Sequence, residues 1–359
     1  MVKLIASERP IRLSRFAHRF EREDIIATAH SLTHRVVYLD PRYHRILAEL
    51  DQGTTLSELR QASPQEVVDE FIDQMVKAKL VVLTEYDEQA YLTEVRKKLF
   101  VGPQFNILFF VLTEACNLDC TYCFIEGGKP EGYHNSMMTP ETAIAAVDAF
   151  ARWASEGGAK NAVFYGGEPL LDTRAMFAAL DRIDEKINEG ALPEDFEKIL
   201  ITNGTLLTAE LIEELVRRDV FPYISIDGPP EVHNRHRPYK DGAGSYDDAV
   251  RGLELIRSVG IEPGISITAD EDVVDNLAEN LAWLIENLNV KSVGFNMLEA
   301  IPGREYYSET YGERFAEALL RCQDICRRHN VYEERVMRKA KQVAKQEMYI
   351  YDCAACGEQ

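Results

Sequence analysis

The sequence has no run of apolar residues long enough to cross a membrane, which takes about 18 to 20 of them. Residues 1–16, MVKLIASERPIRLSRF, also lack the apolar core of a signal peptide. Basic residues are scarce, since 40 Lys and Arg stand against 60 Asp and Glu and the formal net charge is −20. Binding to nucleic acid needs Lys and Arg to neutralise phosphates. We therefore expect a cytoplasmic protein that binds neither a membrane nor nucleic acid.

Cysteine is rare as well, with seven in 359 residues. An odd count in a chain of this length disfavours a disulfide framework. The seven fall into three closely spaced groups, which favours metal or cluster ligation: Cys116, Cys120 and Cys123; Cys322 and Cys326; Cys353 and Cys356.

Residues 1–95 are expected to form a small separate domain. Segments rich in β-branched and aromatic residues predict strands at 15–20, 24–30, 34–40 and 80–85. Apolar residues at helical spacing predict helices at 41–53, 55–62 and 63–80. In the third helix, Ser63 is the predicted N-cap and Glu66 its capping-box partner. Three strands followed by three helices indicate a winged-helix-like α+β domain.

From residue 104 the chain alternates between short apolar runs and amphipathic segments. The apolar runs predict strands at 105–113, 161–167, 198–204, 222–228, 262–270 and 292–298, each followed by a helix. Apolar strands that alternate with helices indicate a parallel sheet covered by helices. We interpret 96–310 as an α/β domain with a partial, TIM-like (β/α)6 barrel; a doubly wound open sheet is the alternative. Residues 311–359 are expected to form a C-terminal helix and the start of a Cys-containing extension.

Polar and glycine-containing motifs follow the first four predicted strands of this barrel. They are TEACNLDCTYCF, YGGEPLL, TNG and SIDGPPEVHNRHRP. Active-site groups of a parallel barrel lie on the loops that follow the carboxyl ends of the strands. Each of the last three motifs by itself also matches an ordinary turn, because Gly, Asp and Pro are common turn formers. Their coincidence at successive strand ends predicts the functional site there.

The first of these loops holds three cysteines in the spacing C-x3-C-x2-C. A [4Fe–4S] cluster normally takes four cysteine ligands, so three would leave one iron free to bind a substrate or cofactor. The alternative is a zinc site completed by a distant Cys or His. Zinc loops favour paired C-x2–4-C groups, which this triplet does not match.

The stretch Cys116-x3-Cys120-x-Tyr122-Cys123 resembles the signature of radical S-adenosylmethionine (radical SAM) enzymes, and GGEP at 166–169 resembles their second motif. The resemblance implies a [4Fe–4S] cluster on Cys116, Cys120 and Cys123, whose open iron binds SAM. An electron from a donor such as flavodoxin or ferredoxin would then cleave SAM, and the resulting 5′-deoxyadenosyl radical would abstract hydrogen from the substrate.

The same resemblance places SAM against the strand-end motifs. The glycines would let the backbone approach SAM closely. Asp227 would accept hydrogen bonds from the ribose hydroxyls, and Asn203 would reach the carboxylate or ribose, while 294–298 would form an apolar wall for adenine. The expected SAM-binding residues are Gly166, Gly167, Glu168, Pro169, Asn203, Ser225 and Asp227. Residues 235–237, Arg-His-Arg, either meet an acidic substrate or the SAM carboxylate, or form a solvated basic loop.

The stretch from SIDGPPEVHNRHRP to GSYDDAVRGLELI resembles the peptide- and protein-modifying branch of this family, which carries SPASM or twitch extensions. Cys353 and Cys356 in YDCAACGEQ would then belong to an auxiliary Fe–S cluster, although the further cysteines of the family pattern are not in this sequence. Cys322 and Cys326 lie on one face of a predicted helix. We interpret them as small buried hydrophobes in preference to cluster ligands.

The element order of 1–95 and the leucine spacing from Ile46 to Leu59 resemble PqqD-like peptide-recognition domains. The resemblance implies that a leader peptide adds a strand to this domain; an inert appendage or a dimerisation unit is the alternative. The whole chain is thus expected to be a maturase of a ribosomally made precursor peptide, with cross-linking as the expected modification. Alternatives are a sulfatase-maturing-type enzyme, a peptide epimerase or splicease, and a metal-stabilised peptide-binding module without catalysis. The sequence assigns no catalytic acid or base and no oligomeric state.

Overall fold

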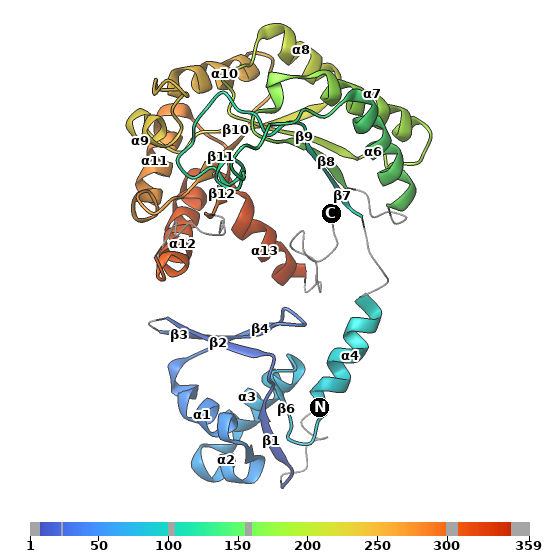
Figure 1. Cartoon of the computed structure of the whole chain (residues 1–359). Coiled ribbons are helices and arrows are strands. Elements are labelled where there is room, and N and C mark those ends of the chain that lie inside the picture. The colour runs from blue at the N-terminus through green and yellow to red at the C-terminus, as the bar shows by residue number, and fades with distance from the viewer. Residues whose placement is uncertain (1–7, 23, 100–104, 155–159, 299–307, 346–359) are drawn as a thin grey trace. The chain divides into compact units, whose positions relative to one another are not determined.

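The computed structural model describes residues 8–22, 24–99, 105–154, 160–298 and 308–345 (Figure 1). The chain divides into two compact units, one built mainly from residues 1–102 and the other mainly from 103–337. No helix among the described residues is long and apolar enough to cross a membrane.

The first unit contains two antiparallel sheets of three strands. One has the order β5-β1-β6, and its strands are β1 (Pro10–Leu13), β5 (Thr54–Thr55) and β6 (Val81–Leu83). The other has the order β2-β3-β4, with β2 (Ala17–Arg22), β3 (Ile25–His30) and β4 (Val36–Leu39). The helical segments are η2 (Pro41–Tyr43), α1 (His44–Gln52), α2 (Leu56–Ala62), α3 (Gln65–Lys77) and α4 (Glu88–Leu99). Strands β1 and β5 were not predicted, because PIRL and TT are too short and too polar to stand out from a loop.

The predicted capping box at Ser63 and Glu66 is wrong. The N-cap of α3 is Pro64, so Ser63 precedes the N-cap position by one residue. Ser63 is instead the C-cap of α2 and has an extended conformation. The capping box lies at the start of α2, where the Thr55 hydroxyl accepts from the Glu58 amide at 3.2 Å. The Glu58 carboxylate in turn accepts from the Thr55 amide at 2.8 Å.

The second unit contains one sheet of seven parallel strands whose spatial order equals their order in the sequence. The strands are β7 (Ile107–Val111), β8 (Asn161–Tyr165), β9 (Glu197–Thr202), β10 (Val220–Ser225), β11 (Gly264–Thr268), β12 (Ser292–Asn296) and β13 (Tyr332–Glu333). A doubly wound sheet requires a point at which the strand order reverses. This order never reverses, so the partial-barrel interpretation is confirmed, with β13 as an unpredicted seventh strand.

Helices follow the strands and cover the outer side of the curved sheet (Figure 1). The longer ones are α6 (Pro140–Trp153), α7 (Arg174–Asn188), α8 (Ala209–Arg217), α10 (Tyr246–Ser258), α11 (Leu277–Leu288) and α12 (Tyr311–His329). The last described helix, α13 (Glu334–Lys345), follows β13. Short segments are α5 (Phe124–Gly127), η3 (Pro169–Leu171), α9 (Pro230–His236) and η4 (Val274–Asn276). Helix α6 begins as predicted, since the Thr139 hydroxyl accepts from the Thr142 amide at 3.2 Å and Pro140 is its first residue.

Helix α10 packs directly on the loop that follows β9. A Cβ added to Gly252 of α10 would lie 2.3 Å from the carbonyl oxygen of Gly204, which is closer than atoms approach in proteins. Gly204 has a φ of +79°, so the TNG turn also needs a glycine. The two glycines therefore let the helix fix the position of the third strand-end loop.

We expect Gly252→Ala to lower the free energy of unfolding by about 1–3 kcal/mol, because either α10 or the Gly204 turn must move. Gly312→Ala is the matched control, since a Cβ there meets no atom within 4 Å. Alanine is the better helix former by up to about 1 kcal/mol, so the control should be neutral or more stable. Urea unfolding followed by circular dichroism measures both. Equal stability of the two variants would contradict the close packing.

Candidate functional site

The cysteine loop follows β7 at the carboxyl edge of the sheet. Cys116, Cys120 and Cys123 are free thiols that are partly exposed. The sulfur of Cys116 accepts from the Leu118 amide at 3.4 Å, and that of Cys123 accepts from the Glu126 amide at 3.4 Å. Burial raises the pKa of the Cys116 thiol and brings that of Cys120 to about 12. Cluster binding at these thiols would therefore release protons.

The GGE part of the second motif lies against the backbone that leads into the cysteine loop. The Gly167 amide donates to the Thr113 carbonyl at 2.7 Å, and the Glu168 amide donates to the Ala115 carbonyl at 2.8 Å. A Cβ at Gly166 would lie 2.4 Å from the Thr113 carbonyl oxygen, and one at Gly167 would lie 2.1 Å from that of Ala115. These glycines therefore permit a close approach of two segments of the chain itself.

Glu168 lies in the interior, with no exposed surface. Its carboxylate accepts from the Thr202 hydroxyl at 2.7 Å, the Asn203 amide at 2.8 Å and the Leu170 amide at 3.0 Å. Burial raises its pKa to about 7, although the three hydrogen bonds oppose the shift. Glu168 thus holds the loop after β9 against the loop after β8.

Asn203 connects that arrangement to the first cysteine. Its side-chain amide donates to Asn117 Oδ1 at 2.9 Å and lies 3.9 Å from the sulfur of Cys116. Its own Oδ1 accepts from the Thr205 amide at 3.0 Å and from the Thr205 hydroxyl at 2.8 Å. Among the expected SAM-binding residues, Asn203 is therefore in direct contact with the cysteine loop.

The carboxylate of Asp227 is also buried, but it is paired with a cation. It accepts from Arg237 at 2.7 and 3.1 Å, from the Thr268 amide at 2.9 Å and from the Tyr122 hydroxyl. Burial by itself would raise the pKa of Asp227, but the charge and hydrogen bonds of Arg237 lower it overall. Asp227 thereby joins the cysteine loop, the segment after β10 and the end of β11.

The basic segment 235–237 is not a solvated loop as a whole. Arg237 is buried on Asp227, and His236 is buried in α9, whereas Arg235 is exposed. Main-chain hydrogen bonds also join the cysteine loop to this segment and to the residue after it. The Thr121 amide donates to the His236 carbonyl at 3.0 Å, and the Asp119 amide donates to the Pro238 carbonyl at 2.8 Å. Sequence reasoning missed these contacts, since nothing in a linear motif indicates that an Arg ten residues after an Asp turns back to it.

The remaining expected residues lie at the same edge or outside the described chain. Pro169 is buried in η3, Ser225 is buried at the end of β10, and Leu298 is buried after β12. Cys353 and Cys356 lie outside the described residues.

Cys322 and Cys326 have no exposed surface and form part of the apolar core beneath α12. Burial raises the pKa of each of these thiols to about 12. Both side chains therefore fit the interpretation as small buried hydrophobes.

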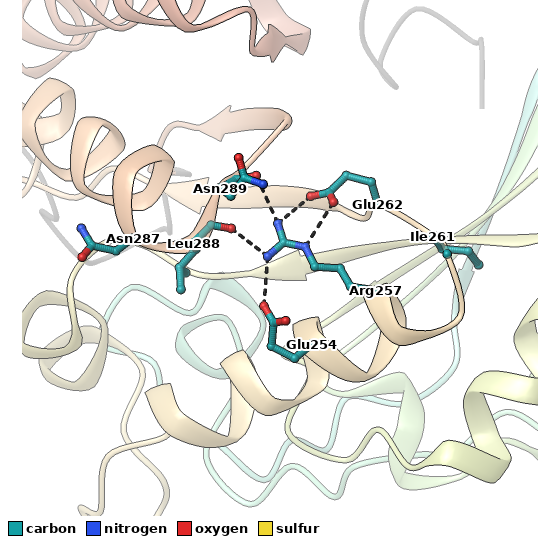
Figure 2. Close-up of a pocket in the computed structure, with 8 residues that line it drawn as sticks. Glu254, Arg257, Ile261, Glu262, Asn287, Leu288 and Asn289 are labelled. Carbon is teal, nitrogen blue, oxygen red and sulfur yellow. Dashed lines mark hydrogen bonds and ion pairs between the residues drawn. The ribbon is translucent and has the colours of Figure 1, made fainter.

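A cavity of about 270 Å³ lies at the carboxyl edge, beside the cysteine loop. It is lined by Thr121, Tyr122, Arg235, His236, Asp270, Glu271, Asp272 and Leu298. A larger cavity of about 520 Å³ lies between the loops that enter β11 and β12, at the opposite edge (Figure 2). Figure 2 shows that Arg257 there is held by Glu254, Glu262 and the Leu288 carbonyl. Since barrel chemistry takes place at the carboxyl edge, the smaller cavity belongs to the functional site.

The donor set of the cysteine loop fits a [4Fe–4S] cluster. In a cubane each cysteine sulfur binds a different iron, so the thiols need not converge on one point. In the part of the chain that the structure describes, no group of three or more His, Cys, Asp or Glu side chains is arranged around a single metal-ion site. The three thiols lie on one partly exposed loop at the edge where the other motifs meet.

Comparisons with known proteins agree with this geometry. Residues 110–279 match the model of the Radical SAM superfamily. The radical SAM cyclopropyl synthase TigE of Paramaledivibacter caminithermalis is 23% identical over 309 residues, which cover 80% of this chain and 63% of that protein. A cysteine-type anaerobic sulfatase-maturating enzyme of Clostridium perfringens is 29% identical over 162 residues, which cover 45% and 43%.

Among solved structures, native anSMEcpe with bound AdoMet aligns with a TM-score of 0.58 and 21% identity over 68% of each chain, so it shares the fold. This chain thus spans less than two thirds of the length of the curated relatives described above. From the family match, the strand order and the cysteine loop together, we conclude that residues 110–279 form a radical SAM domain.

Proposed function

We propose that this chain is a radical SAM enzyme that modifies a ribosomally made peptide. The observation that carries the proposal is the three-cysteine loop, which lies within the matched domain and is held in place by the GGE segment and by α9. When bound, a [4Fe–4S] cluster and SAM supply a 5′-deoxyadenosyl radical that removes hydrogen from an unactivated C–H bond. The similarity to a radical SAM cyclopropyl synthase supports a modification that forms a new bond, and we propose a cross-link.

We assign the residues of the site to cluster binding, SAM binding or positioning of the loops. Cys116, Cys120 and Cys123 would hold the cluster. The loop backbone at Gly166 and Gly167, with Pro169, Asn203 and Ser225, would surround SAM. The oxygens of Glu168 and Asp227 already accept three and four hydrogen bonds within the protein. We therefore assign these two carboxylates to positioning the loops, and ribose binding by Asp227 would require it to exchange a partner.

The N-terminal unit presents a surface that suits a peptide. Phe20, Ile25 and Tyr38 are 63%, 49% and 71% exposed, respectively. Phe20 and Tyr38 both lie in register with Ala27 of the middle strand, so they share one face of the sheet. Strands β2 and β4 are the edges of that sheet. We propose that a leader peptide binds here, and that a flavodoxin or ferredoxin donates electrons to the cluster.

The similarity to the cyclopropyl synthase reaches beyond the barrel. It covers 80% of this chain, whereas residues 103–359 make up less than three quarters of it, so the match extends into the N-terminal unit. An enzyme that needs only the radical SAM domain would not require a similar N-terminal unit. The extent of the match supports a joint role for the two units.

Cys120→Ala is expected to remove almost all iron and sulfide from anaerobically reconstituted protein and to abolish 5′-deoxyadenosine formation from SAM with dithionite. The loss follows because two thiolates cannot hold a cubane. Cys326→Ala is the matched control, because the Cys326 thiol on α12 is buried in the apolar core. This variant should retain the cluster. Iron analysis and chromatography of the nucleoside measure both properties. A wild-type protein that binds only zinc would overturn the proposal.

The buried carboxyl of Glu168 predicts a pH dependence of stability. Its folded pKa of about 7 lies above the ordinary value of 4.5, so the folded state holds the proton more tightly than the unfolded state. The contribution of this carboxyl to stability is complete below about pH 4.5 and is lost as the pH rises to about 7. Between these values, wild type should lose up to about 3 kcal/mol of unfolding free energy relative to Glu168→Gln. Parallel pH curves from urea unfolding of the two proteins would contradict this.

Tyr38→Ala is expected to weaken binding of the proposed precursor peptide by about tenfold, because the ring supplies apolar contact area on the exposed sheet face. Tyr86→Ala is the control, since Tyr86 is 44% exposed and lies after β6, away from that sheet. Fluorescence anisotropy of the labelled peptide on the full chain measures both affinities. Unchanged affinity in the Tyr38 variant would place the leader elsewhere.

A further inference from the structure

Within the smaller cavity, His236 and Asp270 form a pair that the SAM-binding residues do not include. The Nδ1 atom of His236 lies 2.6 Å from Asp270 Oδ2 and 3.3 Å from the Thr121 hydroxyl. The His236 side chain is 4% exposed and that of Asp270 is 13% exposed. The other ring nitrogen, Nε2, is buried and has no hydrogen-bond partner among the described residues.

This contact decides which nitrogen carries the proton when the His236 ring is neutral. A carboxylate accepts but does not donate, so Nδ1 carries the proton and donates it to Asp270. In the neutral ring, Nε2 then presents a lone pair. Burying a polar atom without a partner is unfavourable, so an unpaired buried acceptor indicates a site where a hydrogen-bond donor is expected to bind.

The His236–Asp270 pair lies in the cavity beside the cysteine loop. The cavity joins α9, the loop after β11 and the end of β12 to Thr121 and Tyr122 of the cysteine loop. The rings of His236 and Tyr122 are stacked, with centroids 6.4 Å apart and an angle of 22° between their planes. The cavity therefore borders both the His236 side chain and the loop that would hold the cluster.

The side chains that line the cavity are mostly acidic. Besides Asp270, the lining includes Glu271, which is paired with Arg314, and the exposed Asp272. The cation of the lining, Arg235, is exposed on α9. The carboxylates outnumber it, so the field at the cavity is negative.

We propose that His236, oriented by Asp270, is the proton acceptor for the substrate peptide, and this proposal rests on the proposed function. A substrate N–H, O–H or S–H group donates to Nε2 and then transfers its proton. The donor–hydrogen bond breaks, the Nε2–H bond forms, and the electron pair stays on the substrate atom. That atom becomes a nucleophile, while Asp270 faces the imidazolium that has formed.

The first test reads the ring directly and needs neither cluster nor peptide. The full chain is labelled with ¹⁵N-histidine, and the His236 resonances, among those of eight histidines, are assigned with His236→Gln. Wild type should show a protonated Nδ1 and an unprotonated Nε2. Asp270→Asn should move the proton to Nε2, because an amide can donate to Nδ1. A protonated Nε2 in wild type would overturn the proposal. So would a tautomer that is the same in wild type and in Asp270→Asn.

The second test uses the precursor peptide of the proposed function as the probe. His236→Gln should lower the amount of modified peptide formed per 5′-deoxyadenosine by about 100-fold, and Asp270→Asn by at least about tenfold. His329→Gln, an exposed histidine at the end of α12, is the matched control and should keep the wild-type ratio. An unchanged ratio in His236→Gln would eliminate the assigned role.

The two failures are distinguishable. If wild type cleaves no SAM, the proposed function fails. The tautomer of His236 is measured independently of SAM cleavage, so that result remains valid. If wild type modifies the peptide and His236→Gln does so equally well, only the role of His236 fails.

Discussion

Two main-chain hydrogen bonds position the rest of the site. They run from the amides of Gly167 and Glu168 to the carbonyls of Thr113 and Ala115, and they fix the start of the cysteine loop on the end of β8. The contact is so close that a single methyl group at Gly166 or Gly167 would overlap the opposing backbone. A loop that must present three thiols to one cluster needs such a fixed base, because small displacements of the ligands would prevent simultaneous binding.

The site contains two buried carboxylates that are stabilised in different ways. Asp227 is paired with the buried guanidinium of Arg237, and the pair links the cysteine loop to α9 and β11. Loss of either partner would leave an uncompensated charge in the interior. Glu168 has no cation beside it, so burial raises its pKa even though its three hydrogen bonds oppose the shift, and it holds the Asn203 turn in place. Both carboxylates serve the geometry of loops that are far apart in sequence.

The sequence predicted the barrel well because its strands and helices are long and strongly patterned. Thr139 and Pro140 marked the start of α6, and the apolar runs marked six of the seven strands of the large sheet. The two-residue strand β13 and the short helix α9 left no periodic signal. In the N-terminal unit, the predicted capping box at Ser63 is absent because Pro64 is the N-cap of α3, and the box at Thr55 was not predicted.

The motifs located the site, but they did not reveal its contacts. GGEP suggested glycines that make room for a cofactor, whereas the structure shows that they make room for the protein's own backbone. The segment 235–237 gave no sign that its three residues have three environments, with one exposed, one paired to Asp270 and one paired to Asp227. Such pairings depend on the fold of α9, which the local sequence does not determine.

The central claim is that three thiolates on this loop leave one corner of a cubane open for SAM. Mössbauer spectra of protein reconstituted with ⁵⁷Fe, recorded before and after SAM is added, test it most directly. The account predicts four irons per cluster, of which one changes its spectrum when SAM binds while three stay the same. A cluster whose irons all remain unchanged, or a preparation that holds no iron–sulfur cluster, would contradict it.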